Sequence, residues 1–561
     1  MKARYRIPIT VVYYLALSLV MVYPLYKTGF LFNGYDQVFH LSRAHELATA
    51  FKAGHFGYSY AMNSFNDVGQ AVGVFYPSLS VLVLAIFQLL FSNLVLSTYM
   101  AVFVTVFLGL LISHYAIMRL KKGHLTAAIF SSLYIGSTIF LNVCFVWFDM
   151  GWLWALIFIP LVLSGFVQIF AHRSATVTDF VIGIAALLLS HIVSFFVVLS
   201  GLVVVTVIIA FYRSDFYFYL RKFILGGLVA MGCTAFFWIK FVRIYLTNTI
   251  SGVNKIDSSF YALKPGTIFT DSLNNTSVTG NIGAIILLVL IVLLTQKNKF
   301  DLLDGSALAG SILCLFLSSS LFPWIHVQKY LGSFIQYPVR FLSVAMVGLA
   351  FVAADVLSQM LSTKEYRFKT LTTSGLALGL ILTAFSSATE LSSHLDTNDQ
   401  LRTPSINVLA QPSNKFNENA AKHIFSERFL MAGQFDYWPQ QSIKFGQDII
   451  RHVGAINGKK VRLSPTPVKN GLSYHVSLKK GDQVDLPLLS YGDGLKVPNG
   501  LKVTTSHRGT VLITSNKPVK SIVVERTNSI IDILANVVSV LVAISFAFLW
   551  AHKKFGLKRI F

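Results

Sequence analysis

The side chains best suited to chemistry in this chain are a few ionisable residues that border long apolar segments. Asp36 comes shortly after the first such segment, within residues 34–43 (GYDQVFHLSR). Asp149 separates two apolar runs and is the only acid between Asp67 and Asp179. A carboxylate at such a place is costly unless it has a partner or a task. Carboxylates of this kind are suited to activating a hydroxyl group as a nucleophile.

Two basic side chains interrupt or begin other apolar segments. His191 lies within a long apolar stretch, and Arg340 falls in the first turn of the apolar run that Pro338 begins. Fixed cations of this type suit a phosphate leaving group. Two alternatives remain open at this point. In the first, His191 would only mark a helix break, with its imidazole hydrogen-bonded inside the protein. In the second, Arg340 would only extend its side chain to lipid headgroups.

The residues around Asp36 predict a helix. Apolar residues recur at helical spacing between residues 37 and 51, and polar side chains gather on the opposite face: Arg43 and Glu46, with His40 near its margin. This pattern is typical of an amphipathic helix that lies in the membrane interface. Asp36 would stand at the N-terminal end of this helix. The alternative is that Asp36 is only an N-cap and that the arginine touches lipid headgroups.

Membrane spans must position these residues, because 54% of the 561 residues are hydrophobic and only 12% are charged. A soluble domain carries about 25% charged residues, so ordinary soluble, disordered and fibrous proteins are excluded. The sequence predicts an α-helical polytopic membrane protein with about twelve transmembrane helices. The predicted spans are 7–26, 94–118, 125–146, 152–170, 180–191, 194–212, 223–242, 281–295, 303–322, 338–360, 370–388 and 530–551.

The positions of lysine and arginine predict the topology, because basic loops favour the cytoplasmic side. The apolar run 77–91 is short for a full span, and we interpret it as re-entrant or interfacial. Arg119, Lys121 and Lys122 then fall in a cytoplasmic loop. We therefore expect a multi-pass protein of the cell membrane with both termini in the cytoplasm and the largest loops outside.

Three regions follow from this topology. Residues 1–388 form a transmembrane domain with a large first outer loop, residues 27–93. Residues 389–528 form an extracytoplasmic domain before the last span. Residues 529–561 form the last transmembrane helix and a basic cytoplasmic tail. Asp36, at the start of the first outer loop, is thereby predicted to face the outer side.

The second half of the outer domain is predicted to be a small β sandwich. Apolar residues alternate with polar ones from Leu472 to Leu478, and short β-branched runs recur at 510–514 and 519–524. The segment 389–528 is basic, with 18 lysines and arginines against 11 acids. This charge serves either solubility or attraction to anionic lipid headgroups or an anionic wall polymer.

Several classes of site are excluded by what the sequence lacks. Cys144, Cys233 and Cys314 lie in apolar runs and provide neither a disulfide framework nor a zinc site. The sequence contains no glycine-rich phosphate loop, no HExxH motif and no paired CxxC motif. We expect the lipid bilayer, and no nucleic acid, among the partners.

Short motifs follow one another along most of the chain. They are Asp36 with Phe39-His40-Leu41-x-Arg43, Phe75-Tyr76-Pro77, Asp149, Ser190-His191, Gln336-Tyr337-Pro338-x-Arg340-Phe341 and Asp436-Tyr437-Trp438-Pro439. This series resembles the bacterial YfhO-like membrane proteins, which belong to the polyprenyl-phosphate-dependent glycosyltransferases of the GT-C fold. Three features depart from that pattern. Tyr337 and Val339 stand where relatives carry larger or different aromatic residues, the second acid precedes a glycine rather than following one, and the outer domain is short for the group.

The resemblance implies a GT-C-like transmembrane domain and a glycosyltransferase activity. A sugar would pass from a lipid-linked donor, a polyprenyl-phosphate sugar, to an acceptor hydroxyl on the outer face by one inverting displacement. Asp36 would deprotonate that hydroxyl. Asp149 would orient the acceptor or, with Asp36, hold a divalent cation such as Mg²⁺ or Mn²⁺, although the need for a metal stays open. The implied acceptor is an anionic cell-envelope polymer, a teichoic acid or a polysaccharide.

The resemblance also assigns residues to the leaving group and to the cavity. Arg340 would stabilise the departing phosphate, with contributions from His191, Arg43 or His40. The residues implied to line the donor or acceptor cavity are Tyr76, Gln336, Tyr337 and Trp438. Each assignment follows the position of the residue in the motifs quoted above.

Two other functions compete with the enzyme. A transporter or flippase would also have many spans, but it tends to place ionisable groups near the bilayer midplane and to show internal repeats. A scaffold for envelope assembly would keep the fold without catalysis. A cavity on the outer face that holds Asp36, Asp149 and Arg340 within a few ångströms of one another would favour the enzyme.

Overall fold

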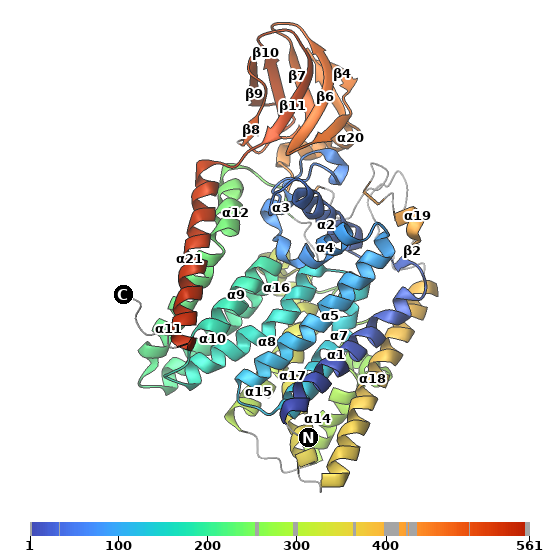
Figure 1. The fold of residues 1–561 in the computed structure, drawn as a ribbon, viewed down its shortest axis with the longest axis vertical. Coiled ribbons are helices and arrows are strands. Elements are labelled where there is room, and N and C mark those ends of the chain that lie inside the picture. The colour runs from blue at the N-terminus through green and yellow to red at the C-terminus, as the bar shows by residue number, and fades with distance from the viewer. Residues whose placement is uncertain are drawn as a thin grey trace.

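The structure, a computed structural model, shows an elongated helical body with a β sandwich at one end (Figure 1). It describes residues 3–32, 34–252, 257–295, 301–362, 366–397, 415–421, 424–425, 435–492 and 494–555. Parts of the predicted outer domain, including residues 398–414, lie outside the described residues, as do residues 556–561 of the predicted basic tail. The first helix starts at the end of the helical body opposite the sandwich.

Eight of the described helices are long and apolar enough to cross a membrane. They are α1 (Ala3–Tyr26), α5 (Leu94–Arg119), α8 (Met150–Ala171), α10 (Ile192–Tyr212), α11 (Phe216–Cys233), α17 (Val339–Ser362), α18 (Tyr366–Thr397) and α21 (Ile530–Phe555). A ninth candidate is a pair bent by 48°, formed by α6 (His124–Ile135) and the segment Thr138–Trp147. The described part of the chain is thus mostly helical and consistent with the predicted polytopic membrane architecture.

Shorter apolar helices occupy three further predicted spans. They are α9 (Thr178–Ser190), α14 (Ala284–Thr295) and α15 (Leu302–Ser318). The predicted span 223–242 is instead divided, because α11 ends at Cys233 and α12 (Ala235–Thr247) begins after Thr234. The number of twelve spans therefore stays a prediction.

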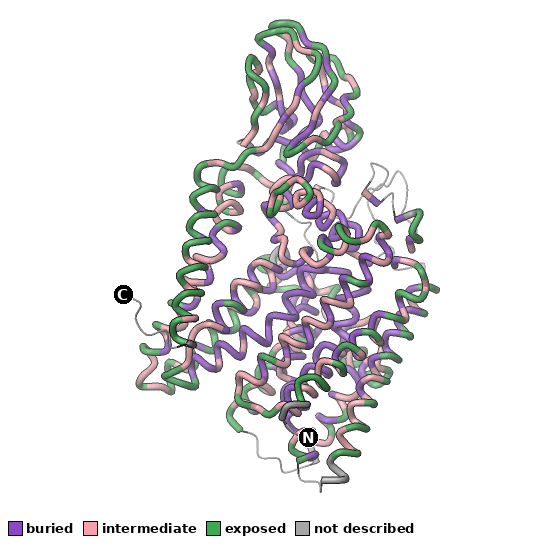
Figure 2. Tube along the Cα trace, viewed as in Figure 1, coloured by how far each residue is buried: buried purple, intermediate pink, exposed green. Residues whose placement is uncertain are grey.

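The candidate spans differ in how deeply they are packed. In α8, 89% of the apolar window is buried, whereas in α21 the share is only 11%. Figure 2 shows exposed residues along most of α21, which packs against α11 and α12 at one edge of the body. The central position of α8 matters for function, because Asp149 directly precedes this helix.

The first outer loop folds into short elements against the ends of the spans. They are β1 (Leu31–Phe32), α2 (Gln37–Lys52), η1 (Phe65–Asp67), α3 (Val72–Phe75), η2 (Ser78–Val81) and α4 (Leu82–Leu90). The predicted helix at 37–51 is confirmed, but the expectation of an exposed polar face is wrong, and its placement in the membrane interface stays a prediction. Arg43 and Glu46 are buried, because neighbouring loop segments cover the polar face, and Glu46 accepts hydrogen bonds from Asn63 and Ser64.

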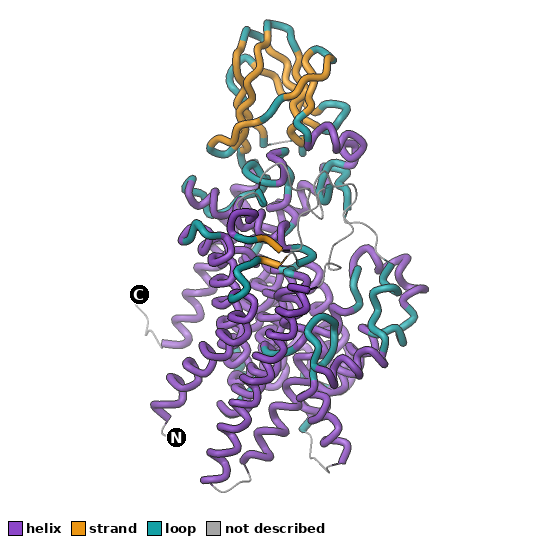
Figure 3. The backbone as a smooth tube through the Cα atoms, turned by 90° about the vertical axis from the view of Figure 1, so that its right-hand side faces the viewer, coloured by secondary structure: helices purple, strands orange, loops and turns teal. Residues whose placement is uncertain are grey.

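The remaining short elements lie between the spans or below the sandwich. They are α13 (Pro265–Asn274), α16 (Trp324–Ile335), β2 (Lys415–Phe416), α19 (Glu418–Ala421), η5 (Gln440–Phe445) and α20 (Gly446–Ile450). Strand β2 pairs with β1, so the outer domain and the first outer loop share a small sheet. Figure 3 shows this pair well below the main group of strands.

The predicted β sandwich is confirmed in the part of the chain before α21. Its strands are β3 (Val453–Ile456), β4 (Lys459–Arg462), β5 (Pro465–Val468), β6 (Gly471–Leu478), β7 (Gln483–Leu489), β8 (Leu495–Lys496), β9 (Leu501–Thr505), β10 (Thr510–Ser515) and β11 (Val519–Arg526). One sheet has the order β4-β3-β7-β10-β9 and the other β5-β6-β11-β8. The alternating apolar residues of β6 form part of the core between the sheets.

The sandwich stands on the first outer loop. Leu489 at the end of β7 donates its N–H to the Val68 carbonyl (2.9 Å), and the His452 ring bonds the Asn66 carbonyl (2.8 Å). Asn66 has a positive φ of 59°, a conformation that asparagine tolerates better than most residues. These bonds join two regions that are almost 400 residues apart in the sequence.

Candidate functional site

The site is built around a break in the helical chain between the bent pair and α8. The last turn before the break, Asn142–Trp147, is a π-helix, and Phe148 then adopts a left-handed conformation (φ 50°). Such irregular turns leave backbone carbonyls unpaired and occur often at functional sites. Here the N–H groups of Tyr35 and Asp36 bond the carbonyls of Val146 (3.0 Å) and Trp147 (2.8 Å). The break therefore holds the segment that carries Asp36.

A glycine permits this close approach of two segments. A Cβ at Gly34 would lie 2.9 Å from the Cβ of Phe148 and 2.9 Å from the Val146 carbonyl oxygen. No real side chain fits in that space. The Gly34 N–H also donates to the Gln37 side chain (3.1 Å), which fixes the turn that leads into α2.

Asp149 lies at the N-cap of α8 and is surrounded by donors. Its Oδ1 accepts from the backbone N–H of Trp152 (3.0 Å) and the Tyr76 hydroxyl (3.0 Å), and it lies 3.3 Å from His40 Nε2. Its Oδ2 lies 4.0 Å from His191 Nε2. Burial alone would raise the pKa of Asp149, but the His40 hydrogen bond and the neighbouring imidazoles hold it below its usual range.

Two imidazoles point an N–H toward Asp149. Arg43 can only donate, and its Nη1 lies 2.9 Å from His40 Nδ1, so the proton of the neutral His40 ring is on Nε2. Burial lowers the pKa of His40 to about 4, which keeps the ring neutral near pH 7. His191 has the same arrangement, because its Nδ1 accepts from the Ser194 N–H (3.3 Å) in the break between α9 and α10.

Arg43 uses both terminal nitrogens of its guanidinium in structural contacts, and only Nε has no hydrogen-bond partner in the described chain. Its guanidinium donates to the Pro77 carbonyl (2.6 Å) and to the Tyr76 carbonyl (3.3 Å), and it lies 4.0 Å from the centre of the Tyr76 ring. The residue is 0% exposed. It therefore orients Tyr76 and His40 and is not placed to meet a phosphate from solvent.

Tyr76 reaches Asp149 only because residue 151 is a glycine. A Cβ at Gly151 would lie 2.2 Å from the Tyr76 hydroxyl oxygen. Tyr76 also contacts the rings of His40 (5.5 Å between centroids) and His191 (6.1 Å). The residues 40, 43, 76, 149 and 191 thus form one packed network, which we call the Asp149 network.

Asp36 differs from Asp149 in having no donors. It stands at the N-cap position of α2, but its side chain makes no capping hydrogen bond and bonds to no described residue. The capping alternative raised by the sequence is therefore not observed. Burial and the nearby Asp149 carboxylate raise the pKa of Asp36 to about 8, Arg340 opposes this, and Asp436 adds to it.

Arg340 is the cation that faces Asp36. Its Nη1 donates to the Ile335 carbonyl (2.8 Å) and to the Gln336 side chain (3.1 Å), but it forms no ion pair with an acid among the described residues. Only 8% of the residue is exposed, and Nε has no hydrogen-bond partner in the described chain. Headgroup contact through an extended side chain does not fit such burial. A buried arginine with free donors is instead suited to an anion.

Gln336 is strained where it supports Arg340. Its φ of 58° with a ψ of −63° is unusual for a residue other than glycine. Backbone strain of this kind costs about 1–3 kcal/mol and tends to persist at functional sites. The strained turn ends α16 and directs both the Ile335 carbonyl and the Gln336 side chain toward the guanidinium.

A row of partly exposed aromatic rings borders Asp36 and Arg340. Tyr35 packs on Trp147 (4.9 Å between centroids), Trp147 on Tyr337 (4.8 Å), and Tyr337 on Tyr261 (5.0 Å). Tyr261 is 43% exposed, and the other three are half-buried. Of these rings the sequence analysis proposed only Tyr337. Trp147 and Tyr261 carry no sequence signal that links them to the site, because each meets Tyr337 from a segment distant in the chain.

Asp436 is a third acid at the site, which the sequence analysis quoted in a motif without giving it a role. It is half-buried, and burial raises its pKa to about 6. Its neighbour Tyr437 stacks on Phe75, next to Tyr76 in the chain (5.2 Å). Trp438 is placed differently from the expectation of a cavity-lining residue. It is 0% exposed and lies in the apolar core below the sandwich.

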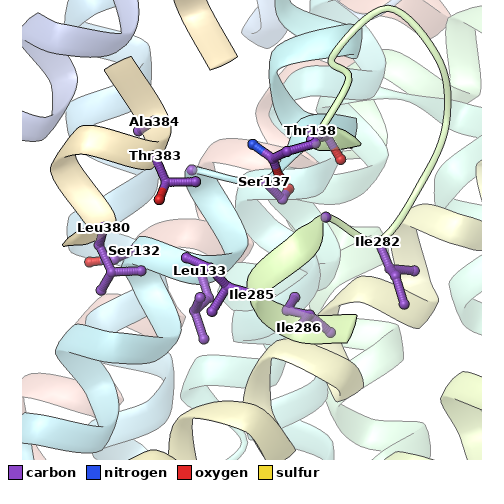
Figure 4. A pocket seen from close by; sticks show the side chains of 13 residues that line it. Ser132, Leu133, Ser137, Thr138, Ile282, Ile285, Ile286, Leu380, Thr383 and Ala384 are labelled. Carbon is purple, nitrogen blue, oxygen red and sulfur yellow. The ribbon is translucent and has the colours of Figure 1, made fainter. Parts of the chain in front are cut away.

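A small pocket lies beside Arg340. Side chains of α8, α10 and α17 line it: Trp152, Ile159, Ser194, Val197, Val198, Arg340, Ser343 and Val344. It is mostly apolar, with the guanidinium as its charged group. A second pocket lies away from the acids, between α6, α14 and α18 (Figure 4), and its volume of about 30 Å³ is close to that of one water molecule.

The metal site predicted from the sequence would be held by Asp36 and Asp149. The described residues contain no group of three or more His, Cys, Asp or Glu side chains arranged around a common metal position. Asp149 also does not fit a cation shared with Asp36, because its Oδ1 already accepts three hydrogen bonds and its Oδ2 faces the His191 N–H.

Comparison with known proteins adds no assignment. No protein-family model matches this chain, and no curated protein matches it significantly. Any function proposed for the chain therefore rests on the geometry of the site.

Proposed function

We propose that this chain is a membrane glycosyltransferase of the GT-C class. It transfers a sugar from a polyprenyl-phosphate carrier to a hydroxyl of an anionic cell-envelope polymer, a teichoic acid or a polysaccharide. One observation carries the proposal: Asp36, a carboxyl group without a hydrogen-bond donor among the described residues, lies near the buried Arg340, which has no acidic partner among them either. A purely structural role would pair both groups.

The two groups fit the two charge changes of such a transfer. The acceptor oxygen bonds to the anomeric carbon while the bond between that carbon and the phosphate oxygen breaks. The acceptor proton passes to Asp36, so the carboxylate acts as a general base. The electron pair of the broken bond stays on the phosphate, whose added charge Arg340 stabilises with its free donors. The configuration at the anomeric carbon is inverted.

The surroundings of the two groups fit the two substrates. Partly exposed aromatic rings, Trp147 and Tyr337 among them, offer flat apolar surfaces to the C–H face of a sugar. The pocket with Arg340 at its edge is mostly apolar, but its volume of about 10 Å³ must widen before an apolar chain that ends in a phosphate can enter. The rings and the arginine together favour a donor that carries both a sugar and a phosphate.

Asp149 takes a positioning role in this proposal. It holds His40, Tyr76 and His191 through hydrogen bonds and short contacts and raises the pKa of Asp36 by its charge. The proposed step uses only side chains of the protein, because Asp149 is not free to share a metal ion with Asp36. The site and the sandwich are proposed to lie outside the cytoplasmic membrane, with both termini inside. A reporter fused after Lys122 should then respond as cytoplasmic, and one fused within 457–520 as external.

Transfer by the purified chain tests the proposal. The protein in lipid nanodiscs is given polyprenyl-phosphate-linked hexoses and a glycerol-phosphate polymer, and the polymer is analysed by mass spectrometry. Wild type and Asp257→Asn, a change at an exposed acid, should add hexose. Asp36→Asn should be slower by about 10²–10⁴-fold, the usual contribution of a general base. The proposal fails if wild type transfers no hexose from any donor, or if Asp36→Asn matches it.

A further inference from the structure

Four turns of the sandwich meet at the end that faces away from the helices, and together they form a surface that we call the distal cap. Hydrogen bonds place them side by side. Asn457 N–H donates to the Gln483 carbonyl (2.9 Å), Gly481 N–H to the Ser515 carbonyl (2.7 Å), and Asn516 N–H to the Gly500 carbonyl (2.8 Å). The cap comprises residues 457–460, 479–482, 498–502 and 516–520.

The opposite end of the sandwich is the one attached to the helices. Leu489 and His452 bond the first outer loop there, and β11 continues from that end into α21. Strand β6 has eight residues, so the cap stands about 25 Å beyond the attached end at about 3.3 Å per residue. Figure 1 shows the strands leading away from the helical body. A membrane around the helices is thus several Debye lengths from the cap, since that length is about 8 Å at physiological salt.

Positive charge is concentrated on the cap. Its seven lysines are all exposed: Lys459, Lys460, Lys479, Lys480, Lys502, Lys517 and Lys520. The cap contains one acid, Asp482, whose carboxylate accepts from the Lys479 N–H (2.7 Å) and from Asn457 (2.9 Å). The rest of 446–528 carries six basic residues and four acids. The charge is therefore segregated, and general solubility does not require such segregation.

Several like charges at one end of a domain repel one another, and a ligand with repeated negative charges relieves that repulsion. Lysine suits this task because its ammonium group is a mobile point charge, which follows a flexible polyanion without demanding one geometry. One cap lysine, Lys460, pairs with an acid outside the cap, Asp448 (2.9 Å), and Arg508 elsewhere in the sandwich lies 3.7 Å from Asp485. The other six cap lysines form no ion pair with an acid among the described residues. The cap thus has the chemistry of a polyanion contact and no pocket for a single small ion.

We propose that the distal cap binds a phosphate-containing polymer of the cell envelope. Binding itself does not depend on sugar transfer, but the role we give it, capture of the acceptor above the catalytic site, rests on the proposed function. The cap is too far from the bilayer to serve as a headgroup contact for the same membrane. The ligand class is a linear polymer of phosphodiesters, recognised by charge and not by the identity of its sugars.

A matched pair of triple variants tests the cap. The first combines Lys479→Gln, Lys480→Gln and Lys517→Gln. The control removes the same number of exposed positive charges near the attached end of the sandwich, through Arg451→Gln, Lys469→Gln and Lys496→Gln. Each full-length protein is placed in nanodiscs of neutral lipid. Binding of a fluorescent glycerol-phosphate polymer is then measured by anisotropy at low and high salt.

The cap variant should bind at least about tenfold more weakly than wild type at low salt, with a shallower salt dependence because fewer counterions are released. The control should stay within about threefold of wild type. Equal losses in the two variants, or no binding by wild type, would overturn the proposal. So would a wild type that binds phosphatidylglycerol vesicles through these lysines but not the polymer.

Binding and catalysis are separated by a second measurement. Asp36→Asn protein should bind the polymer as tightly as wild type, since Asp36 is far from the cap. Failure of the proposed function would leave this binding intact, whereas failure of the cap proposal would leave sugar transfer to a small soluble acceptor intact. Loss of polymer binding in Asp36→Asn would count against the cap as the binding surface.

Discussion

Two carboxylates at the same break in the chain have opposite surroundings. Asp149 accepts from a backbone N–H, a tyrosine hydroxyl and an imidazole, and its pKa is held low. Asp36 has no donor among the described residues, and its pKa is raised to about 8. A buried charge that is satisfied, as in Asp149, supports folding, whereas Asp36 is half-buried and is partly removed from water without gaining a donor among the described residues. Under the proposed function, this difference gives Asp149 an architectural role and Asp36 a chemical one.

The largest effect on stability should come from removing the satisfied carboxylate. Asp149→Ala leaves the Tyr76 hydroxyl, the His40 N–H and the Trp152 N–H without their acceptor, and each buried unpaired group costs about 1–3 kcal/mol. We expect a clear fall in the melting temperature of the purified protein. Asp257→Ala, at an exposed acid, is the control and should melt like wild type. An unchanged melting temperature for Asp149→Ala would show that Asp149 does not stabilise the fold.

The next effect concerns the cation that partners Asp36. Arg340→Lys keeps the charge but loses the fork of fixed donors. Transfer should fall by about 10²-fold, the loss seen when one donor to a developing oxyanion is removed. Melting should change little, because no acid depends on Arg340 for pairing in the described chain. Full activity in this variant would show that Arg340 does not stabilise the leaving phosphate.

A smaller effect is expected where Tyr76 approaches α8. Gly151→Ala places a methyl group where the Tyr76 hydroxyl now lies, 2.2 Å from the new Cβ. Tyr76 must then withdraw from Asp149, so this variant should lose more stability than Tyr76→Phe, which deletes only the hydroxyl. Thermal melting of both variants ranks them. The opposite ranking would show that Tyr76 can move away from the new methyl group at little cost in stability, and that the contacts of the Asp149 network are weak.

The smallest effect is a pH dependence. A carboxyl whose pKa is raised on folding binds its proton more tightly when folded, so its contribution to stability declines as pH rises from about 4 to about 8. Asp36→Asn removes this pH-dependent contribution to stability. The melting temperature of Asp36→Asn relative to wild type should therefore increase with pH across that interval. The transfer rate of wild type should rise over the upper part of the same interval, as Asp36 ionises.

The sequence predicted the residues of this site better than their arrangement. Asp36, Asp149 and Arg340 were selected because charged groups are rare beside apolar runs, and the structure brings them together. Which acid is free was not predictable. It depends on a π-turn before Asp149 and on a glycine that admits Tyr76, and both act through contacts between segments distant in the chain.

For the fold as well, local patterns were predictable from the sequence and contacts between distant segments were not. Hydropathy located the apolar helices and alternation located β6, because both signals are local. Arg43 was expected on an exposed polar helix face and is instead buried against Tyr76. The sequence of one helix does not show which other segments of the chain pack on it. Asp436 was left without a role for the same reason. It is 400 residues from Asp36 in the sequence and meets the site through tertiary contacts, such as the packing of Tyr437 on Phe75 and the hydrogen bond from Gln70 to the Asp436 carbonyl (2.8 Å).

The central claim, that Asp36 is held for chemistry and Asp149 for structure, is tested most directly by comparing Asp36→Asn with Asp149→Asn at pH 8. Sugar transfer and thermal melting are measured on the same purified samples. The account predicts that Asp36→Asn melts at or above wild type and transfers at least about 10²-fold more slowly. Asp149→Asn should melt below wild type. The account is contradicted if Asp36→Asn transfers at the wild-type rate, or if it melts well below both other proteins.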